Sequence, residues 1–106
     1  MAWVYLVTAG ILEIIWAYSM KKSDGFTVLI PTIVTIIFMF GSFALLSLAM
    51  RTLPLGTAYT IWTGIGAVGA FLVGILILGE LASPMRIAAA SRIIAGLVMM
   101  KLSSSA

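Results

Sequence analysis

Cysteine, histidine and charged side chains are absent or scarce in this chain of 106 residues. It has no cysteine and no histidine, and 8% of its residues are charged, whereas 63% are hydrophobic. The chain therefore lacks disulfides, thiol chemistry and the usual ligands of transition metals, and we expect no metal site and no cofactor. No nucleophile is paired with a base, and no glycine-rich loop joins a strand to a helix. The sequence does not predict an enzyme.

The balance of apolar and charged residues indicates an integral membrane protein. A soluble domain has roughly 25% charged residues, well above the share in this chain. Polar and turn-forming residues interrupt the sequence at intervals, and between them the apolar runs are continuous. Strands of a transmembrane barrel would instead alternate apolar and polar residues. The fold class that we predict is an all-α membrane protein.

Four apolar runs are long enough to cross a bilayer, which takes about 20 residues as a helix. The runs lie near residues 3–20, 28–50, 56–78 and 85–102. We predict that residues 1–106 form a single transmembrane domain of four helices with short loops. The first run lacks the basic lead-in and the small-residue cleavage site of a signal peptide, so we expect a retained helix. Residues 103–106 are predicted to be a frayed tail.

Basic residues are divided almost evenly between the two sides of the predicted bundle. One side carries Arg51 and Lys101, and the other carries Lys21, Lys22 and Arg86. Because the bias of Lys and Arg sets the orientation of a membrane protein, this balance predicts insertion in both orientations and an antiparallel homodimer. The net charge of +3 is spread over loop ends. It favours anionic lipid headgroups over nucleic acid as a partner.

Glu13 is the only acidic residue inside an apolar run, and it lies midway between Trp3 and Met20. A carboxylate within a membrane usually marks a functional site, although a protonated Glu13 that hydrogen-bonds a neighbouring helix is the alternative. Two such groups facing one cavity in a dimer would repel each other and lose solvation together, so they would hold protons at working pH. A cation entering between them would expel the protons. The sequence predicts an antiporter that releases two protons for each monovalent cation.

Several residues are predicted to surround Glu13, since helical positions three, four and seven apart share a face. Gly10 leaves room beside the carboxylate, and the indole N–H of Trp16 can orient it. On the third run Tyr59 can donate a hydrogen bond to Glu13 of either protomer. The other residues expected to frame the site are Ser42, Trp62 and Thr63. Ordinary helix packing remains the alternative for this set, and a hydrogen bond back to its own helix is the alternative for Ser42.

Small residues suggest roles for the third and fourth runs beyond the site. Gly64 and Gly66 weaken the third helix against bending, and we expect a kink there that lets the cavity open alternately to the two sides. Ser91, Ala95 and Gly96 are predicted to pack helices together in the dimer. Plain close packing is the alternative explanation for the glycines.

These residues together resemble the small multidrug resistance family over nearly the whole chain. The resemblance rests on Glu13, on the segment Lys-Ser-Asp-Gly-Phe at 22–26, and on Gly-Thr-Ala-Tyr-Thr-Ile-Trp-Thr-Gly at 56–64. Trp16 together with Ser42 is similar to the guanidinium-exporter subtype. One residue departs from the pattern, because Thr60 lies where the family usually has alanine.

The resemblance implies an antiparallel, dual-topology homodimer that exchanges protons for guanidinium across the bacterial inner membrane. It implies that Glu13 binds substrate or proton and that Gly10, Trp16, Ser42, Tyr59 and Trp62 frame the site. Guanidinium carries a planar fork of N–H donors, and this fork matches the two oxygens of a carboxylate such as that of Glu13. Two other functions remain open at this point. One is a broader exporter of hydrophobic and quaternary ammonium cations, and the other is a passive pore or membrane assembly factor.

Overall fold

The computed structural model describes residues 1–103, and these residues form four α-helices and no strand. The helices are α1 (Ala2–Lys22), α2 (Leu29–Ala49), α3 (Leu55–Leu76) and α4 (Pro84–Ser103). The prediction of an all-α fold with four helices is confirmed. Of the predicted frayed tail, Ser103 is the last residue of α4, and the remaining residues lie outside the part of the chain that is described.

The turn between α1 and α2 is built from local hydrogen bonds around Ser23. The Ser23 hydroxyl donates to the carbonyl of Met20 at 2.7 Å and accepts from the backbone N–H of Phe26 at 3.1 Å. Asp24, Gly25 and Phe26 all have positive φ, at 50°, 73° and 66°. This left-handed stretch reverses the chain, and glycine at its centre is the residue that adopts such φ values most readily.

Proline marks the start of the other two helices. Pro54 caps α3 in an extended conformation, and Pro84 is the first residue of α4. The fixed φ and the missing N–H of proline suit the first turn of a helix, where a backbone N–H would have no intrahelical partner. The turn-forming residues of the sequence therefore coincide with the observed connections.

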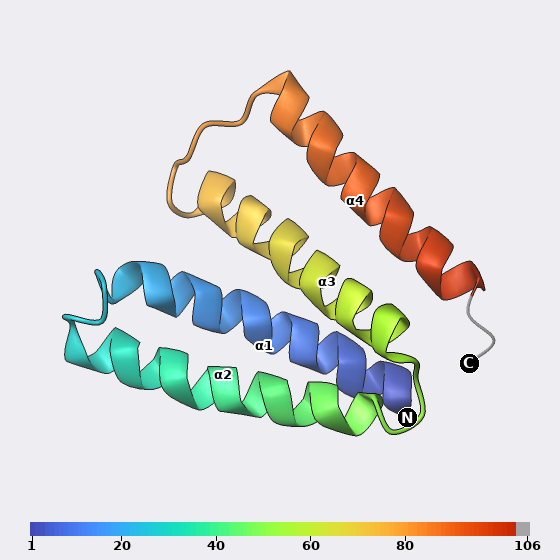
Figure 1. Cartoon of the computed structure of the whole chain (residues 1–106). Coiled ribbons are helices and arrows are strands. Elements are labelled where there is room, and N and C mark those ends of the chain that lie inside the picture. Colours follow the sequence, from blue (N-terminus) through green and yellow to red (C-terminus); the bar gives the residue numbers. More distant parts are fainter. Residues whose placement is uncertain (104–106) are drawn as a thin grey trace.

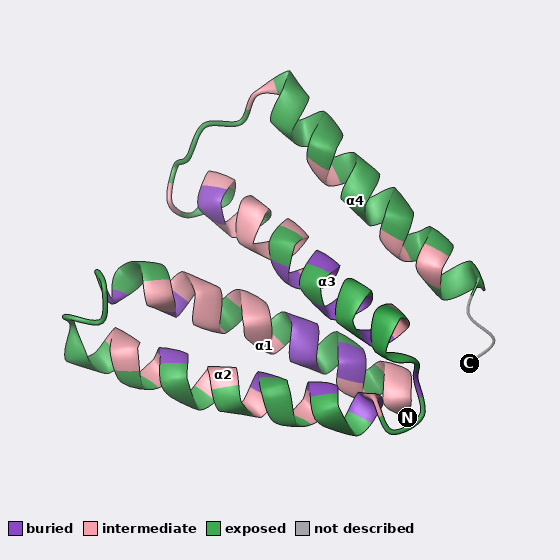
Figure 2. Cartoon of the chain, in the orientation of Figure 1, coloured by how far each residue is buried: buried purple, intermediate pink, exposed green. Residues whose placement is uncertain are grey.

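α1 is the central helix of the bundle and packs between α2 and α3, while the backbone of α4 neighbours only that of α3 (Figure 1). The largest apolar cluster joins the first half of α1 to α2 and α3. Its buried members are Leu6, Ala9, Leu46, Ala49, Leu53, Ala58, Ile61 and Trp62. No residue of α4 is buried, in contrast to the other three helices (Figure 2).

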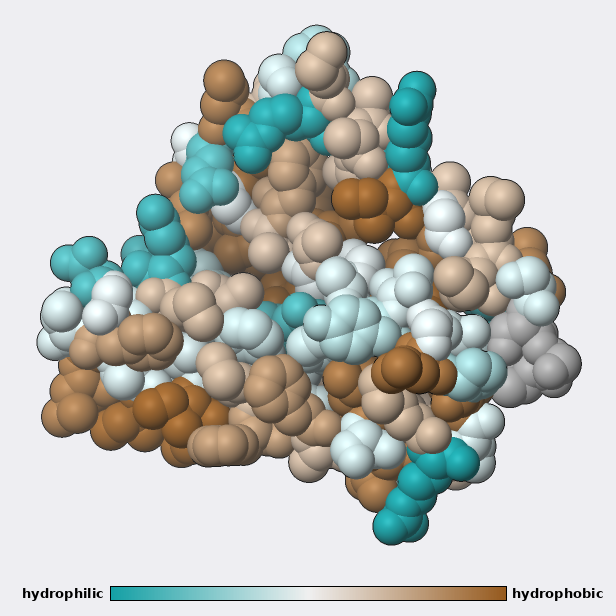
Figure 3. Space-filling model, in the orientation of Figure 1, coloured by the Kyte–Doolittle hydropathy of each residue, from teal (hydrophilic) through white to brown (hydrophobic). Residues whose placement is uncertain are grey.

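Three of the helices, α1, α2 and α3, are long and apolar enough to cross a membrane. α4 has 20 residues, enough for a span of about 30 Å, but Arg86, Arg92 and Lys101 make it less apolar. Apolar side chains cover much of the visible surface, and hydrophilic side chains gather mostly at its margins (Figure 3). Such a surface is suited to lipid rather than water.

Candidate functional site

Glu13 on α1 faces Gly66 on α3, and the two residues fit together closely. A Cβ atom at position 66 would collide with the carboxyl carbon and Oε1 of Glu13. Glu13 is half-buried, and its Oε1 is buried without a hydrogen-bond partner among residues 1–103. A buried carboxyl oxygen without a donor is energetically unfavourable, so this group is poised to take a proton or a cationic donor.

Other glycines also bring α1, α3 and α4 close together. A Cβ at Gly10 would lie 2.7 Å from Cγ2 of Ile65, and one at Gly69 would collide with Ile14. Gly64 lies against Leu97 of α4 in the same way. Small residues of this kind allow the backbones of neighbouring membrane helices to approach each other closely. α3 is one continuous helix from Leu55 to Leu76, and the kink at Gly64 and Gly66 stays a prediction.

Ser42 connects three helices through two buried hydrogen bonds. Its hydroxyl donates to the carbonyl of Ala9 on α1 at 2.7 Å and accepts from the indole N–H of Trp62 on α3 at 3.0 Å. Ser42 is completely buried, and both bonds are long-range. The Ser42 hydroxyl therefore bonds neither its own helix nor Glu13. It fixes Trp62 beside α1 and leaves the Glu13 carboxyl free of this network.

Four aromatic rings form a row across α1, α2 and α3. The centroid distances are 6.3 Å from Trp16 to Phe43, 5.7 Å from Phe43 to Trp62 and 5.5 Å from Trp62 to Tyr59. The Trp16–Phe43 pair is edge-on, with an interplanar angle of 73°. These spacings lie in the range that favours aromatic pairs. Sequence reasoning missed one member of this row, Phe43.

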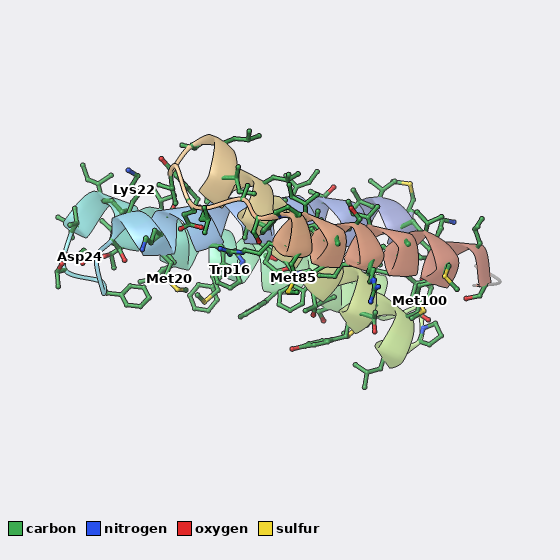
Figure 4. The ribbon with its side chains drawn as sticks, turned by 90° about the horizontal axis from the view of Figure 1, so that it is seen from above. Trp16, Met20, Lys22, Asp24, Met85 and Met100 are labelled. Carbon is green, nitrogen blue, oxygen red and sulfur yellow. The ribbon has the colours of Figure 1, made fainter. Side chains whose placement is uncertain are left out.

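Trp16 belongs to this row but does not hold Glu13 within the described chain. Its indole N–H is buried and has no hydrogen-bond partner among residues 1–103. In Figure 4 Trp16 lies toward the middle of the molecule, whereas Lys22 and Asp24 lie at one end. Among residues 1–103, the middle of α1 thus has two buried polar atoms without a partner, Oε1 of Glu13 and the indole nitrogen of Trp16.

Tyr59 and Thr63 border a separate open space between α3 and α4. This α3–α4 hollow has a volume of about 520 Å³. Its lining includes Tyr59, Thr60, Thr63 and Gly64 of α3 and Gly96 and Leu97 of α4. Tyr59 is 53% exposed, and no hydrogen bond joins it to Glu13 within the described residues. The structure therefore brings Trp16, Ser42, Tyr59 and Trp62 together but turns Thr63 toward α4.

The residues predicted to pack helices together on α4 are all exposed. They are Ser91, Ala95 and Gly96. The Ser91 hydroxyl donates to the carbonyl of Ile87 at 2.9 Å, a bond within its own helix. A Cβ at Gly96 would meet no atom within 4 Å among the described residues. Ser91 and Ala95 therefore lie on a face of α4 that is open to another helix, and Gly96 borders the α3–α4 hollow.

Comparison with known proteins identifies the family. The family model described as Small Multidrug Resistance protein matches residues 1–94. The chain belongs to the small multidrug resistance family. Proteins named guanidinium exporter from Citrobacter freundii and Klebsiella oxytoca are each 56% identical to it over 104 residues, which is 98% of this chain and 99% of the relative. A protein of that name from Escherichia coli strain K12 is 51% identical over the same coverage.

Membership of the small multidrug resistance family confirms the resemblance inferred from the sequence. It also confirms a multi-pass helical protein of the bacterial inner membrane. The composition of α4 alone does not mark it as a span, but as part of a four-helix small multidrug resistance protein it crosses the membrane with the other three. The candidate site described above therefore lies within the membrane-spanning part of the protein.

Replacing Ser42 by alanine should destabilise this small multidrug resistance protein. The change leaves the buried N–H of Trp62 without its acceptor, and such a loss amounts to about 1–3 kcal/mol. We expect a lower melting temperature when the unfolding of the protein in detergent is monitored by circular dichroism. The matched control is Ser47→Ala, an exposed serine on the same helix, which should melt like the unchanged protein. Equal melting of the two variants would contradict the bridging role of Ser42.

Proposed function

We propose that this chain is a proton-coupled antiporter that exports guanidinium and small guanidinyl cations by alternating access. The observation that carries the proposal is the Glu13 carboxyl against Gly66, buried at Oε1 and without a hydrogen-bond partner among residues 1–103. The relatives of 51–56% identity are named guanidinium exporters, which supports this cation as the substrate. The cation is moved without chemical change, so the chain is not an enzyme.

Guanidinium suits the chemistry of this site. Its planar fork of N–H groups can bind both oxygens of a carboxylate, and its flat face can lie against aromatic rings. Glu13 supplies the carboxylate, and the row from Trp16 to Tyr59 supplies the rings. A quaternary ammonium ion has no N–H donors and would leave the carboxyl oxygens unpaired. In this proposal Gly10 and Ser42 complete the frame of the site, and Thr63 borders the neighbouring α3–α4 hollow.

Proton coupling follows from competition for Glu13. A proton and a guanidinium ion cannot both neutralise the same carboxylate, so each displaces the other. With two Glu13 carboxylates in a dimer, binding of one cation releases two protons, and exchange moves net charge. Bending of α3 at Gly64 and Gly66 would open the shared cavity to one side at a time.

An antiparallel homodimer is part of the proposal and is supported by what one protomer leaves uncovered. α4 has no buried residue, and the α3–α4 hollow is open beside Tyr59. A second copy that packs on Ser91, Ala95 and Gly96 would cover this face with small residues, as membrane helices do. The near-even division of basic residues supports opposite orientations of the two copies.

The proposal is tested with purified protein in liposomes that are acidic inside. We expect labelled guanidinium to enter only while the pH gradient lasts and to stop when an ionophore collapses it. Liposomes without protein give the background. Entry at the same rate without a gradient would overturn the antiporter and indicate a pore. Strong transport of a single-tailed quaternary ammonium competitor would contradict selectivity for guanidinium and would indicate a broader exporter of cations.

Thr60 should have little influence on the choice of cation. It is exposed and lines the α3–α4 hollow beside Tyr59, the last ring of the aromatic row, whereas the other three rings continue from Trp62 away from that hollow toward α2 and α1. We expect Thr60→Ala to leave the ratio of guanidinium to quaternary ammonium uptake within about twofold, the usual range for an exposed substitution. Uptake of both cations in liposomes measures the ratio. A large change would mean that Thr60 reaches the path of the cation.

A further inference from the structure

Trp3 separates two hollows at the end of the bundle where the chain begins. One has a volume of about 310 Å³ and lies between α1, α3 and α4; its apolar lining includes Val7, Ile61 and Val98. The other has a volume of about 410 Å³ and lies between the start of α1 and the end of α2. We call the first hollow the Trp3 groove. Its lining is apolar apart from Lys101, and it is open at the surface of the bundle, as an acyl chain requires.

Basic side chains border both hollows. Lys101, in the last turn of α4, lines the Trp3 groove and places its Nζ 4.3 Å from the centroid of the Trp3 ring. Arg51 lines the neighbouring hollow together with Met1. The indole N–H of Trp3 is buried and has no hydrogen-bond partner among residues 1–103. The Trp3 groove thus borders the ammonium group of Lys101 and an indole N–H that has no partner among the described residues, and Arg51 lies in the hollow on the other side of Trp3.

Apart from Glu13 in the middle of α1, the acidic residues Asp24 and Glu80 lie toward the opposite end of the molecule. Asp24 follows α1 and lies beside Lys22, and Met100 in the last turns of α4 lies at the other end (Figure 4). Glu80 shares a hollow with Lys21, which also belongs to the end of α1. No acidic residue lines either hollow beside Trp3. Among residues 1–103, no carboxylate therefore lies in the two hollows that Arg51 and Lys101 border.

From this arrangement we infer that one anionic phospholipid binds at Trp3, with an acyl chain in the Trp3 groove and its phosphate beside the ammonium group of Lys101. Basic pockets between membrane helices bind anionic headgroups, and tryptophan is enriched at the depth where chain and headgroup meet. Lys101 reaches this depth because a lysine near a helix end extends its ammonium group toward the interface. A zwitterionic lipid would bring a second positive charge to the same place and would bind less well.

The test measures quenching of Trp3 fluorescence by lipids with brominated acyl chains, in detergent-solubilised protein. The contribution of Trp3 is the difference between the unchanged protein and Trp3→Phe, which removes the background of the other tryptophans. Phosphatidylglycerol should reach half-maximal quenching at a several-fold lower lipid fraction than phosphatidylcholine. Lys101→Gln should raise that fraction about fivefold for phosphatidylglycerol, equivalent to about 1 kcal/mol for one basic residue near an anionic surface.

The control is Lys22→Gln, an exposed lysine at the other end of α1, which should leave both quenching curves unchanged. Counting phosphatidylglycerol molecules retained in native mass spectrometry gives the same contrast without fluorescence. Equal quenching by the two lipids, or an equal effect of Lys22→Gln and Lys101→Gln, would overturn the site. Absence of quenching by either lipid would also overturn it and would indicate that a second copy of the chain covers the groove.

Discussion

Glu13→Gln should abolish gradient-driven uptake of guanidinium. The amide has nearly the same size as the carboxyl group and still fits against Gly66, but it neither releases a proton nor balances the charge of a cation. Because a hydrogen bond to a charged group contributes about 1.5–3 kcal/mol, we expect guanidinium binding to weaken about 10- to 100-fold. Uptake into liposomes should fall to the level of liposomes without protein.

The controls for Glu13→Gln separate charge from position. Glu80→Gln removes an acid that lies outside the membrane-spanning helices, beside Gly74, and should leave uptake near that of the unchanged protein. Glu13→Asp keeps a carboxylate but withdraws it from Gly66, so coupling should persist at a lower rate. If uptake survives Glu13→Gln, the proton and the cation do not compete at Glu13, and a pore becomes the better account.

Gly66→Ala should severely slow the transport of guanidinium. The added Cβ would collide with the Glu13 carboxyl, so either the side chain of Glu13 must turn away or α1 and α3 must separate. Overpacking of this kind is unfavourable by about 1–3 kcal/mol, partly offset by about 1 kcal/mol from the better helix propensity of alanine. We expect guanidinium uptake to fall at least tenfold with a small change in melting temperature.

Two further glycine variants test the reason for that loss. Gly56→Ala places a Cβ on the same helix where no atom lies within 4 Å among the described residues, and it should transport normally. Gly64→Ala meets Leu97 instead of Glu13. If bending of α3 is what matters, Gly64→Ala and Gly66→Ala should slow transport alike. If the fit of the carboxyl is what matters, only Gly66→Ala should do so. Normal transport by Gly66→Ala would contradict both accounts.

The sequence was sufficient to predict the fold, and it singled out Glu13 as a candidate site residue. Continuous apolar runs indicate membrane helices, and Pro54, Pro84 and the Ser23–Phe26 turn mark where these helices begin or end. A single acid within apolar sequence is also visible without any structure. These signals are local, since each depends on residues close together in the chain.

The contacts between helices could not be predicted in the same way. Ser42 bonds Ala9 and Trp62, which lie 33 and 20 residues away, and their pairing depends on the rotation of each helix about its axis. In an apolar helix neither face is clearly polar, so periodicity does not reveal that rotation. Phe43 was missed for this reason: it lies in an aromatic stretch with Phe38 and Phe40, which reads as lipid-facing.

The turn after α1 bears on the order in which the site is assembled. Its hydrogen bonds join Met20, Ser23, Phe26, Thr27 and Val28. The hairpin of α1 and α2 can therefore close during synthesis, before α3 has left the ribosome. At that stage Glu13 has no glycine to lie against, and Ser42 has Ala9 but not Trp62. A hairpin of α1 and α2 without α3 therefore exposes the Glu13 carboxyl to the lipid or to the insertion machinery. Packing of α3 against α1 then buries this carboxyl.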